Sequence, residues 1–330
     1  MQEYFPLTQT NSSKALIMYN KASQRGEQLY LPLTQEAFHA LFLTPPKSGD
    51  HVFAFYEARQ RGFICGVFDS ITTRFFLTLI EVEPGYRQGG IGSLLLAGLE
   101  QEMQRFAAAR QVSFTELEVS YFNPMNITWV LPGTEGHRHP NASGVRLGSD
   151  AHLFLKNRGF EDFTIQNSYH LDVTRYVYPK ASLARYEEKM NSRGLTVELY
   201  DPARHYGMQD LVDDLNNDLW NWQIPAEMNR EGGPRPMLIV SDGGKIVGFA
   251  GPIVPDAHGR GFFLGIAIHS QYRGYGAATV LFNHLCLEFR RAGAQYMTLF
   301  TAEDNPARHI YERAGFKIHA SWAGTKKKEN

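Results

Sequence analysis

One stretch of the sequence occurs twice, and this duplication constrains the fold more than any other feature. Residues 76–92 and 262–278 align without a gap. In each copy an apolar, β-prone run leads into a glycine-rich turn containing Tyr-Arg, and apolar residues at helical spacing follow. The pattern predicts a strand, a tight turn and a helix twice over, in two domains of related fold.

The segments around the duplicated stretch repeat as well. Strand pairs are predicted within 51–67 and 237–249, and each half has a second short helix that ends in Gly-Phe, at 159–160 and 315–316. A chain of 330 residues typically forms two domains. The expected divisions are a first domain over 1–175, a helical connector over 176–194 and a second domain over 195–330.

The first half contains an additional segment near residues 122–148, rich in proline, glycine and histidine. An irregular segment of this length in a compact domain is usually functional or disordered, and its Trp, Leu and Pro content argues against disorder. The pair His137 and His139 suggests a metal site, but we expect the two side chains on opposite sides of an extended chain, and no third ligand is in view. We therefore expect no metal there, and a segment that packs over the domain junction.

Composition narrows the classes of function. Lys and Arg number 33 and Asp and Glu 34, which argues against non-specific binding to nucleic acid or anionic membranes. The N-terminus lacks a basic segment followed by an apolar one, and no apolar run approaches the ~20 residues that span a bilayer. We expect a cytoplasmic protein with two buried thiols, Cys65 and Cys286, and a solvated tail at residues 326–330.

The glycine turns predict anion sites. Each turn presents several backbone N–H groups at a helix N-terminus, whose partial positive charge attracts an anion. Glycine permits positive φ and a close approach, and Arg87 and Arg273 each add a guanidinium fork. Neither turn has the Gly-Lys-Ser/Thr of a P-loop, and the first lacks the third glycine of a dinucleotide fingerprint. The expected ligand is a phosphate or a diphosphate.

Two motifs together resemble a known family. Arg87-x-x-Gly90-x-Gly92 and Arg273-x-x-Gly276-x-Ala278 resemble the acyl-CoA pyrophosphate loop of the GNAT N-acetyltransferases, and the segment 305–316 resembles that family's second motif. The resemblance covers nearly the whole chain as two tandem copies. It implies an α/β (α+β) protein with two tandem GNAT folds, each a mixed, mostly antiparallel sheet flanked by helices.

The resemblance also implies site residues. The central strand of each half is implied to separate from its neighbour at a bulge, which frees main-chain groups for the pantetheine arm of acetyl-CoA. Tyr311 matches the family's frequent general acid, and Asn305 matches a frequent pantetheine contact. The other implied acetyl-CoA contacts are Ile266, Ala267, Ile268, Arg273, Gly274, Tyr275, Gly276, Ala277 and Ala278 in the second half and Ile80, Val82, Arg87, Gln88, Gly89, Gly90, Ile91 and Gly92 in the first.

The implied reaction is direct transfer of an acetyl group from acetyl-CoA to a primary amine of a small molecule or peptide, without a metal. The amine must lose a proton and the leaving thiolate must gain one. No general base is evident: Glu81 has Ala267 as its counterpart, and the other candidates are His269, Glu303 and Asp304. The acceptor, the acyl group and a homodimer are left open.

The two halves differ in the second motif. Alignment on Gly-Phe places Leu155 opposite Tyr311 and Ser149 opposite Asn305, so we expect the chemistry in the second half. The aromatic and acidic stretch 213–222 lies where this fold usually builds its acceptor pocket, although an ordinary core helix explains it equally well. The alternative of another class is a non-catalytic acyl-CoA-binding or regulatory protein on the same fold.

Overall fold

The computed structural model describes residues 3–26, 29–134, 136–139 and 141–328, so two positions of the additional segment, 135 and 140, lie outside the described residues. The chain divides into two compact units: unit 1 is Met1–Asn167 with Ala320–Asn330, and unit 2 is Ser168–His319. These ranges differ from the expected ones because two long strands, β7 (Glu161–Asp172) and β15 (Lys317–Lys328), are each shared between the units.

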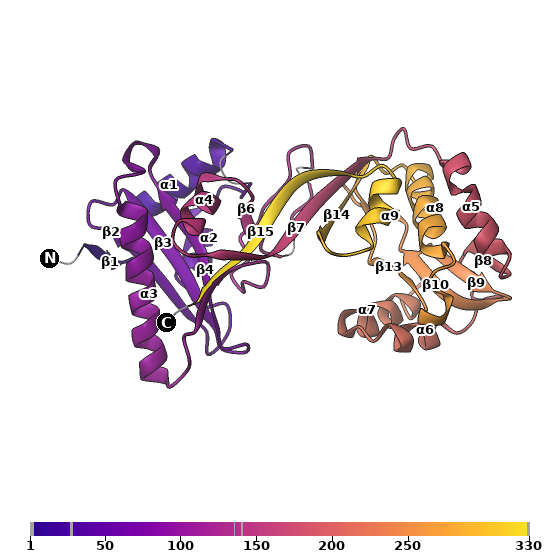
Figure 1. Ribbon diagram of the computed structural model, residues 1–330, viewed down its shortest axis with the longest axis horizontal. Helices are drawn as coiled ribbons and strands as arrows, with labels where there is room; N and C mark the ends of the chain where they lie inside the picture. The colour runs from indigo at the N-terminus through magenta and orange to yellow at the C-terminus, as the bar shows by residue number, and fades with distance from the viewer. Residues whose placement is uncertain (1–2, 27–28, 135, 140, 329–330) are drawn as a thin grey trace. The chain divides into compact units, whose positions relative to one another are not determined.

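Unit 1 is a sheet with helices on both faces (Figure 1). Its strands follow the order β1-β2-β3-β4-β5-β15, and only β4 and β5 are parallel among the described pairs. The expected mixed, mostly antiparallel sheet is therefore confirmed. Its elements are β1 (Tyr4–Pro6), α1 (Ser13–Gln24), α2 (Gln35–Phe42), β2 (His51–Glu57), β3 (Gly62–Asp69), β4 (Arg74–Val82), the 3₁₀ turn η1 (Pro84–Tyr86), α3 (Ile91–Arg110), β5 (Glu116–Val119), β6 (Val145–Arg146) and α4 (Asp150–Lys156).

Alternation along β3 explains the two layers of unit 1. Ile64 and Phe68 belong to the core cluster that contains α3, whereas Cys65 and Val67 belong to the cluster that contains α1 and α2. Successive side chains of a strand point to opposite faces, so an unbroken apolar strand needs a helix layer on each side. All eight residues of β3 are buried.

The C-terminal strand completes the sheet of unit 1. β15 runs antiparallel to β5, from Thr325 opposite Val119 to Lys328 opposite Glu116. Lys326 also pairs with Glu116 at 3.0 Å. For Lys326–Lys328 the expected solvated tail was wrong, because the lysine run lies in a strand whose partner is distant in sequence. The last two residues of the expected tail, 329 and 330, lie outside the described residues.

The additional segment packs within unit 1. Trp129 is fully buried, and its ring stacks on His139 at 3.5 Å and lies 4.8 Å from the ring of Trp322. The expectation that the two histidines lie on opposite sides of an extended chain was wrong, because residues two positions apart in such a chain share a face, and their rings lie 4.2 Å apart. Among the described residues no group of three or more His, Cys, Asp or Glu side chains could hold a metal ion.

Unit 2 has its own four-stranded sheet, in the order β13-β10-β9-β8 (Figure 1). Val240 and Val247 pack in the cluster that contains α8, while Ile239 and Ile246 pack in the one that contains α6. Its elements are α5 (Lys180–Asn191), β8 (Leu195–Leu199), α6 (Met208–Leu215), α7 (Asp218–Met228), β9 (Leu238–Asp242), β10 (Lys245–Gly251), β11 (Val254–Pro255), β12 (Gly261–Phe262), β13 (Gly265–Ile268), η2 (Ser270–Tyr272), α8 (Ala277–Arg291), β14 (Tyr296–Ala302) and α9 (Arg308–Arg313).

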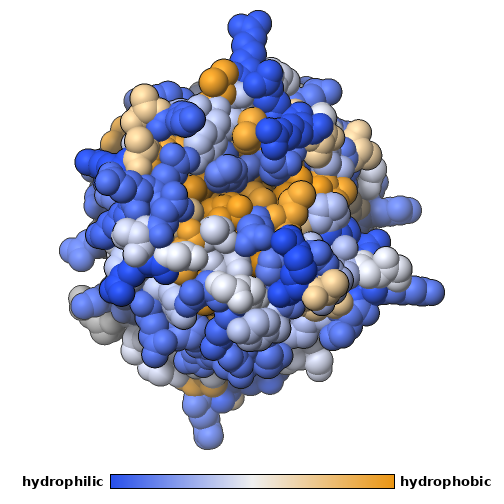
Figure 2. Space-filling view, turned by 90° about the vertical axis from the view of Figure 1, so that its right-hand side faces the viewer, coloured by the Kyte–Doolittle hydropathy of each residue, from blue (hydrophilic) through white to orange (hydrophobic). Residues whose placement is uncertain are grey.

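The face of the molecule in Figure 2 is largely hydrophilic, with one hydrophobic region. On the face that Figure 2 shows, hydrophobic side chains gather near the centre, framed by hydrophilic ones. No helix within the described ranges combines the length and the apolar character needed to cross a membrane.

Candidate active site

The central strand of unit 2 has one open edge. β13 pairs with β10, and within the described part of the chain β14 belongs to another sheet. The N–H of His269 donates to the carbonyl of Val247 at 2.9 Å. Because hydrogen-bonded and non-hydrogen-bonded pairs alternate in an antiparallel ladder, the main chain of Ala267 also faces β10, whereas Ile266 and Ile268 face the open edge.

The turn after β13 leaves a row of unused donors. Gly274 and Gly276 both have φ of +83°, which glycine adopts without the penalty of a side chain. Within the residues that the structure describes, the main-chain N–H groups of 274–278 have no acceptor. They stand at the N-terminus of the 15-residue helix α8. This geometry suits a diphosphate, since several donors and the positive end of the helix dipole meet at one place.

Unit 1 contains the same construction. The N–H of Glu83 donates to the carbonyl of Arg61 at 2.9 Å, so the same alternation turns Ile80 and Val82 to the other edge of β4. β4 pairs with β5 only at Phe75 and Phe76, and a bulge separates this paired part from the rest of the strand. Among the described residues, the N–H groups of 88–92 have no acceptor either.

The arginine of each turn holds the turn against its own strand. Arg273 donates from Nε to the carbonyl of Ile268, and Arg87 donates from Nε to the carbonyl of Val82, both at 3.0 Å. Each bond spans five residues, from the guanidinium back to the end of the strand. Both side chains therefore contact the main chain through Nε, and in Arg273 the two terminal guanidinium nitrogens point to no carboxylate of the described residues within 4.0 Å, so a phosphate could bind them.

The charges around the two turns differ. In unit 1, Arg87 lies 3.2 Å from the carboxylate of the buried Glu81 and 3.7 Å from that of Asp150. In unit 2 the position of Glu81 is occupied by Ala267, and no carboxylate of the described residues comes within 4.0 Å of Arg273. The first turn thus has carboxylates in direct contact with its arginine, which disfavour a second anion. The carboxylate beside the second turn, Asp214, is bonded to Ser270 and interacts with Arg273 only from more than 4.0 Å.

Tyr311 lies on α9 with its ring in the core of unit 2. The ring centroid is 5.0 Å from that of Phe282 and 6.3 Å from that of Phe316. Within the described ranges its hydroxyl has no hydrogen-bond partner, and burial raises the pKa of Tyr311 above its usual value. The hydroxyl therefore stays protonated at neutral pH and is available as a proton donor.

The side chain of Asn305 is used locally. Its Oδ1 accepts from the N–H of Ala307 at 3.0 Å, and its Nδ2 donates to Thr301 at 2.9 Å. Ser149 likewise accepts from a main-chain N–H, that of His152, at the start of α4. Both side chains thus accept a main-chain N–H near the start of their helix, but Ser149 caps α4 directly, whereas Asn305 lies before the N-terminal residue of α9 and also bonds to Thr301. The second motifs differ further at Tyr311 and the buried Leu155.

Residues that could accept a proton are held in different ways. Nδ1 of His269 accepts from the N–H of Gln271 at 3.3 Å, and its Nε2 lies 3.6 Å from Asp214. Asp214 accepts from the N–H and the hydroxyl of Ser270, at 2.7 and 2.5 Å, and chiefly the hydroxyl bond lowers the pKa of Asp214. Asp214 therefore ties α6 to the turn. Glu303 and Asp304 are exposed.

Trp220 of α7 packs against the start of β13. A Cβ placed on Gly265 would lie 2.5 Å from the Trp220 ring, so the glycine is required for this contact. The ring also meets Phe249 edge-on, with centroids 5.8 Å apart. The aromatic stretch therefore contributes to the core and lies one residue away from Ile266 at the open edge.

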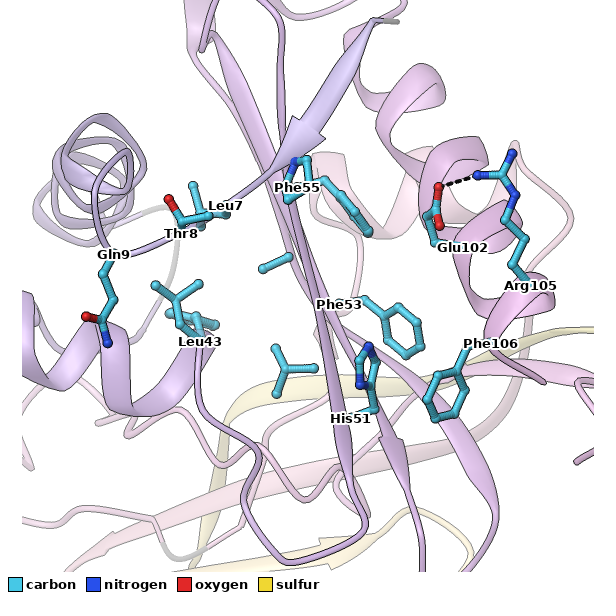
Figure 3. A pocket seen from close by; sticks show the side chains of 14 residues that line it. Leu7, Thr8, Gln9, Leu43, His51, Phe53, Phe55, Glu102, Arg105 and Phe106 are labelled. Atoms are coloured by element: carbon cyan, nitrogen blue, oxygen red, sulfur yellow. Dashed lines mark hydrogen bonds and ion pairs between the residues drawn. The ribbon is translucent and has the colours of Figure 1, made fainter. Parts of the chain in front are cut away.

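A separate cavity lies in unit 1. It has a volume of about 540 Å³ and is bordered by Leu43, by His51 and Phe53 of β2, and by Glu102 and Phe106 of α3 (Figure 3). None of the residues predicted to bind acetyl-CoA lines it.

Comparisons with known proteins agree with this geometry. Residues 16–124 and 193–316 match the acetyltransferase (GNAT) family. A relative from Haemophilus influenzae, the [ribosomal protein bS18]-alanine N-acetyltransferase, is 30% identical over 95 residues, which are 29% of this chain and 64% of that protein. The chain therefore spans less than two thirds of the length of that relative.

Solved structures share the fold over the whole chain. A GCN5-related N-acetyltransferase from Sphaerobacter thermophilus is 13% identical with a TM-score of 0.56, over 98% of this chain and 95% of that one. A tandem GNAT protein from the clavulanic acid biosynthesis pathway is 14% identical with a TM-score of 0.50, over 99% and 98%. The glucosamine N-acetyltransferase region of a fungal β-N-acetylglucosaminidase is 12% identical with a TM-score of 0.57, over 99% of this chain and 38% of that one.

Proposed function

Because the chain belongs to the acetyltransferase (GNAT) family, we propose that it transfers an acetyl group from acetyl-CoA to a primary amine and that unit 2 carries the chemistry. One observation carries this proposal: unit 2 combines an open strand edge, a row of unused N–H donors and a tyrosine hydroxyl that lacks a partner among the described residues. Unit 1 has the first two features and Leu155 in place of the third.

Each part has a role in the proposed reaction. The N–H groups of 274–278 and the helix end bind the diphosphate, and Ile266 and Ile268 hold the pantetheine amides at the open edge. The amine nitrogen attacks the thioester carbonyl carbon, a C–N bond forms and the C–S bond breaks. Tyr311 gives its proton to the leaving sulfur, and the proton lost by the amine passes to water.

The acceptor class is a small-molecule or peptide amine. Of the relatives, one acts on the alanine of a ribosomal protein and another on glucosamine, so both amine classes belong in a test. Release of free CoA thiol from acetyl-CoA should be followed for the full-length protein with peptides that begin with alanine and with amino sugars. Thiol release that depends on an added amine supports the proposal. Binding of acetyl-CoA with no turnover on any amine would favour a non-catalytic binding protein.

A further inference from the structure

Four basic side chains surround the glycine turn of unit 2. Three come from α5 and the residues after it, and one comes from α9. They are Arg185, Lys189, Arg193 and Arg313, and we call them the cationic rim. All four are exposed, and none has a carboxylate within 4.0 Å among the residues that the structure describes.

Two tyrosines hold the cationic rim beside the turn. Tyr275 belongs to the turn itself, and the guanidinium of Arg193 lies 4.5 Å from its ring centroid, with Lys189 at 5.8 Å. Tyr186 of α5 lies against the turn, because a Cβ on Gly276 would be 2.9 Å from its ring. The guanidinium groups of Arg185 and Arg313 lie 4.7 and 5.6 Å from the Tyr186 ring. The rim is therefore anchored to the same loop that presents the unused N–H groups.

The spacing of the rim carries an energetic cost. Arg185 and Lys189 are four residues apart on α5 and so lie on one side of it, and Arg193 lies in the turn after its end, beside the same Tyr275 ring as Lys189. Like charges at this spacing destabilise a helix by about 0.2–0.5 kcal/mol per pair. The tyrosines offset part of that repulsion, since Arg185 donates to the Tyr186 hydroxyl at 2.7 Å and Arg193 donates to that of Tyr275. No carboxylate of the described residues lies within 4.0 Å of the rim, so a bound anion would supply the missing countercharge.

We propose that the cationic rim binds the 3′-phosphate on the ribose of coenzyme A, so that unit 2 selects the complete coenzyme over 3′-dephospho-CoA. The inference rests on the proposed function, since it requires the diphosphate of the same molecule to occupy the turn. A phosphate monoester carries between one and two negative charges at neutral pH and accepts several charge-assisted hydrogen bonds. The ribose joins this group to the diphosphate, so both anions arrive in one ligand.

Titration calorimetry with CoA and with 3′-dephospho-CoA tests the inference on the full-length protein. We expect CoA to bind about tenfold more tightly than 3′-dephospho-CoA at low salt, and the difference to shrink as ionic strength rises. A double substitution, Lys189→Gln with Arg193→Gln, should lower the affinity for CoA about tenfold and change that for 3′-dephospho-CoA by less than twofold. Lys189→Arg, which keeps the charge, should retain the preference.

A matched control comes from unit 1. Arg158 bonds to Ser93 in the first turn of α3 at 3.1 Å, so Arg158→Gln removes a cation beside the other glycine turn and should leave the preference unchanged. Equal binding of the two ligands by the unsubstituted protein would overturn the inference and leave acetyl-CoA binding intact. An equal loss of both ligands in a double variant that melts normally would also overturn it. Failure of both ligands to bind the unsubstituted protein would overturn the proposed function itself.

Discussion

The two glycine turns share their main-chain geometry and differ in their charges. In both, an arginine Nε lies 3.0 Å from the carbonyl five residues earlier, and a glycine with φ near +84° precedes the helix, at +85° for Gly90 and +83° for Gly276. Around the first turn, Glu81 and Asp150 approach the arginine. Around the second turn lie four cations without carboxylate partners within 4.0 Å among the described residues.

The comparison shows which parts of a duplicated anion site are constrained. Positive φ leaves little choice of residue at Gly90 and Gly276, so this main-chain geometry is common to both turns, whereas only Gly276 is also packed closely. The side chains that border the two turns differ: Glu81 is buried beside Arg87 in unit 1, whereas the four cations of the rim in unit 2 are exposed. Two turns with the same backbone geometry can therefore differ in affinity for a polyanion such as acetyl-CoA. The substitutions below test whether unit 2, rather than unit 1, binds acetyl-CoA and carries out the reaction.

The largest effect should come from the packing of unit 1. Trp322 is 3% exposed and meets the fully buried Trp129, so Trp322→Ala should reduce the free energy of unfolding by about 3–5 kcal/mol. Denaturant titration measures this loss. We expect the folded fraction to keep its kcat for acetyl transfer, because the residue lies in unit 1. A kcat that falls tenfold in fully folded protein would contradict the division between the units.

The next effect concerns the hydroxyl of Tyr311. Tyr311→Phe should lower kcat about 100-fold, the scale of a lost general acid, with little change in the affinity for acetyl-CoA. Steady-state thiol release and calorimetry give the two quantities. Tyr169→Phe is the control: its ring lies 6.4 Å from that of Tyr311, but its hydroxyl is already bonded to Glu312 at 3.0 Å. Comparable losses in both variants would mean that Tyr311 acts only through packing.

The sequence predicts some features of the two glycine turns and not others. The strand, turn and helix of each copy follow from local patterns, and so do Gly90 and Gly276 at positions of positive φ. Local patterns do not predict which way each main-chain group faces. The main chain of Ala267 faces β10 because His269 pairs with Val247, and this register depends on a strand some twenty residues away. The implied bulge occurs beside β4, whereas β13 pairs with β10 without a shift of register.

Features that depend on contacts between residues distant in sequence were not predicted. Lys326–Lys328 have the composition of a tail, and only their pairing with β5 makes them a strand of unit 1. The cationic rim had a visible signal, the four-residue spacing of Arg185, Lys189 and Arg193, but its position beside the turn depends on how α5 packs. Local sequence therefore predicts the main-chain site well and the side chains that border it poorly.

A smaller effect distinguishes the turns directly. Gly276→Ala adds a Cβ 2.9 Å from Tyr186, whereas Gly90→Ala meets nothing within 4 Å. Both changes carry the similar cost of positive φ, about 1–2 kcal/mol. The additional clash should weaken acetyl-CoA binding about tenfold in the first variant, and the second should change it less than twofold. Calorimetry measures both, and a larger loss for Gly90→Ala would assign the coenzyme to unit 1.

The smallest expected effect is in the pH dependence of kcat. Burial raises the pKa of Tyr311 above its ordinary value of about 10, and a general acid works only while protonated. Its protonated fraction falls only as the pH passes the raised pKa, so kcat at saturating amine should change less than twofold between pH 8 and pH 10. Thiol release, corrected for uncatalysed hydrolysis, measures the profile. A descending limb with a midpoint below pH 10 that disappears in Tyr311→Phe would show that the hydroxyl ionises too early for this role, and the catalytic difference between the two units would then need another cause.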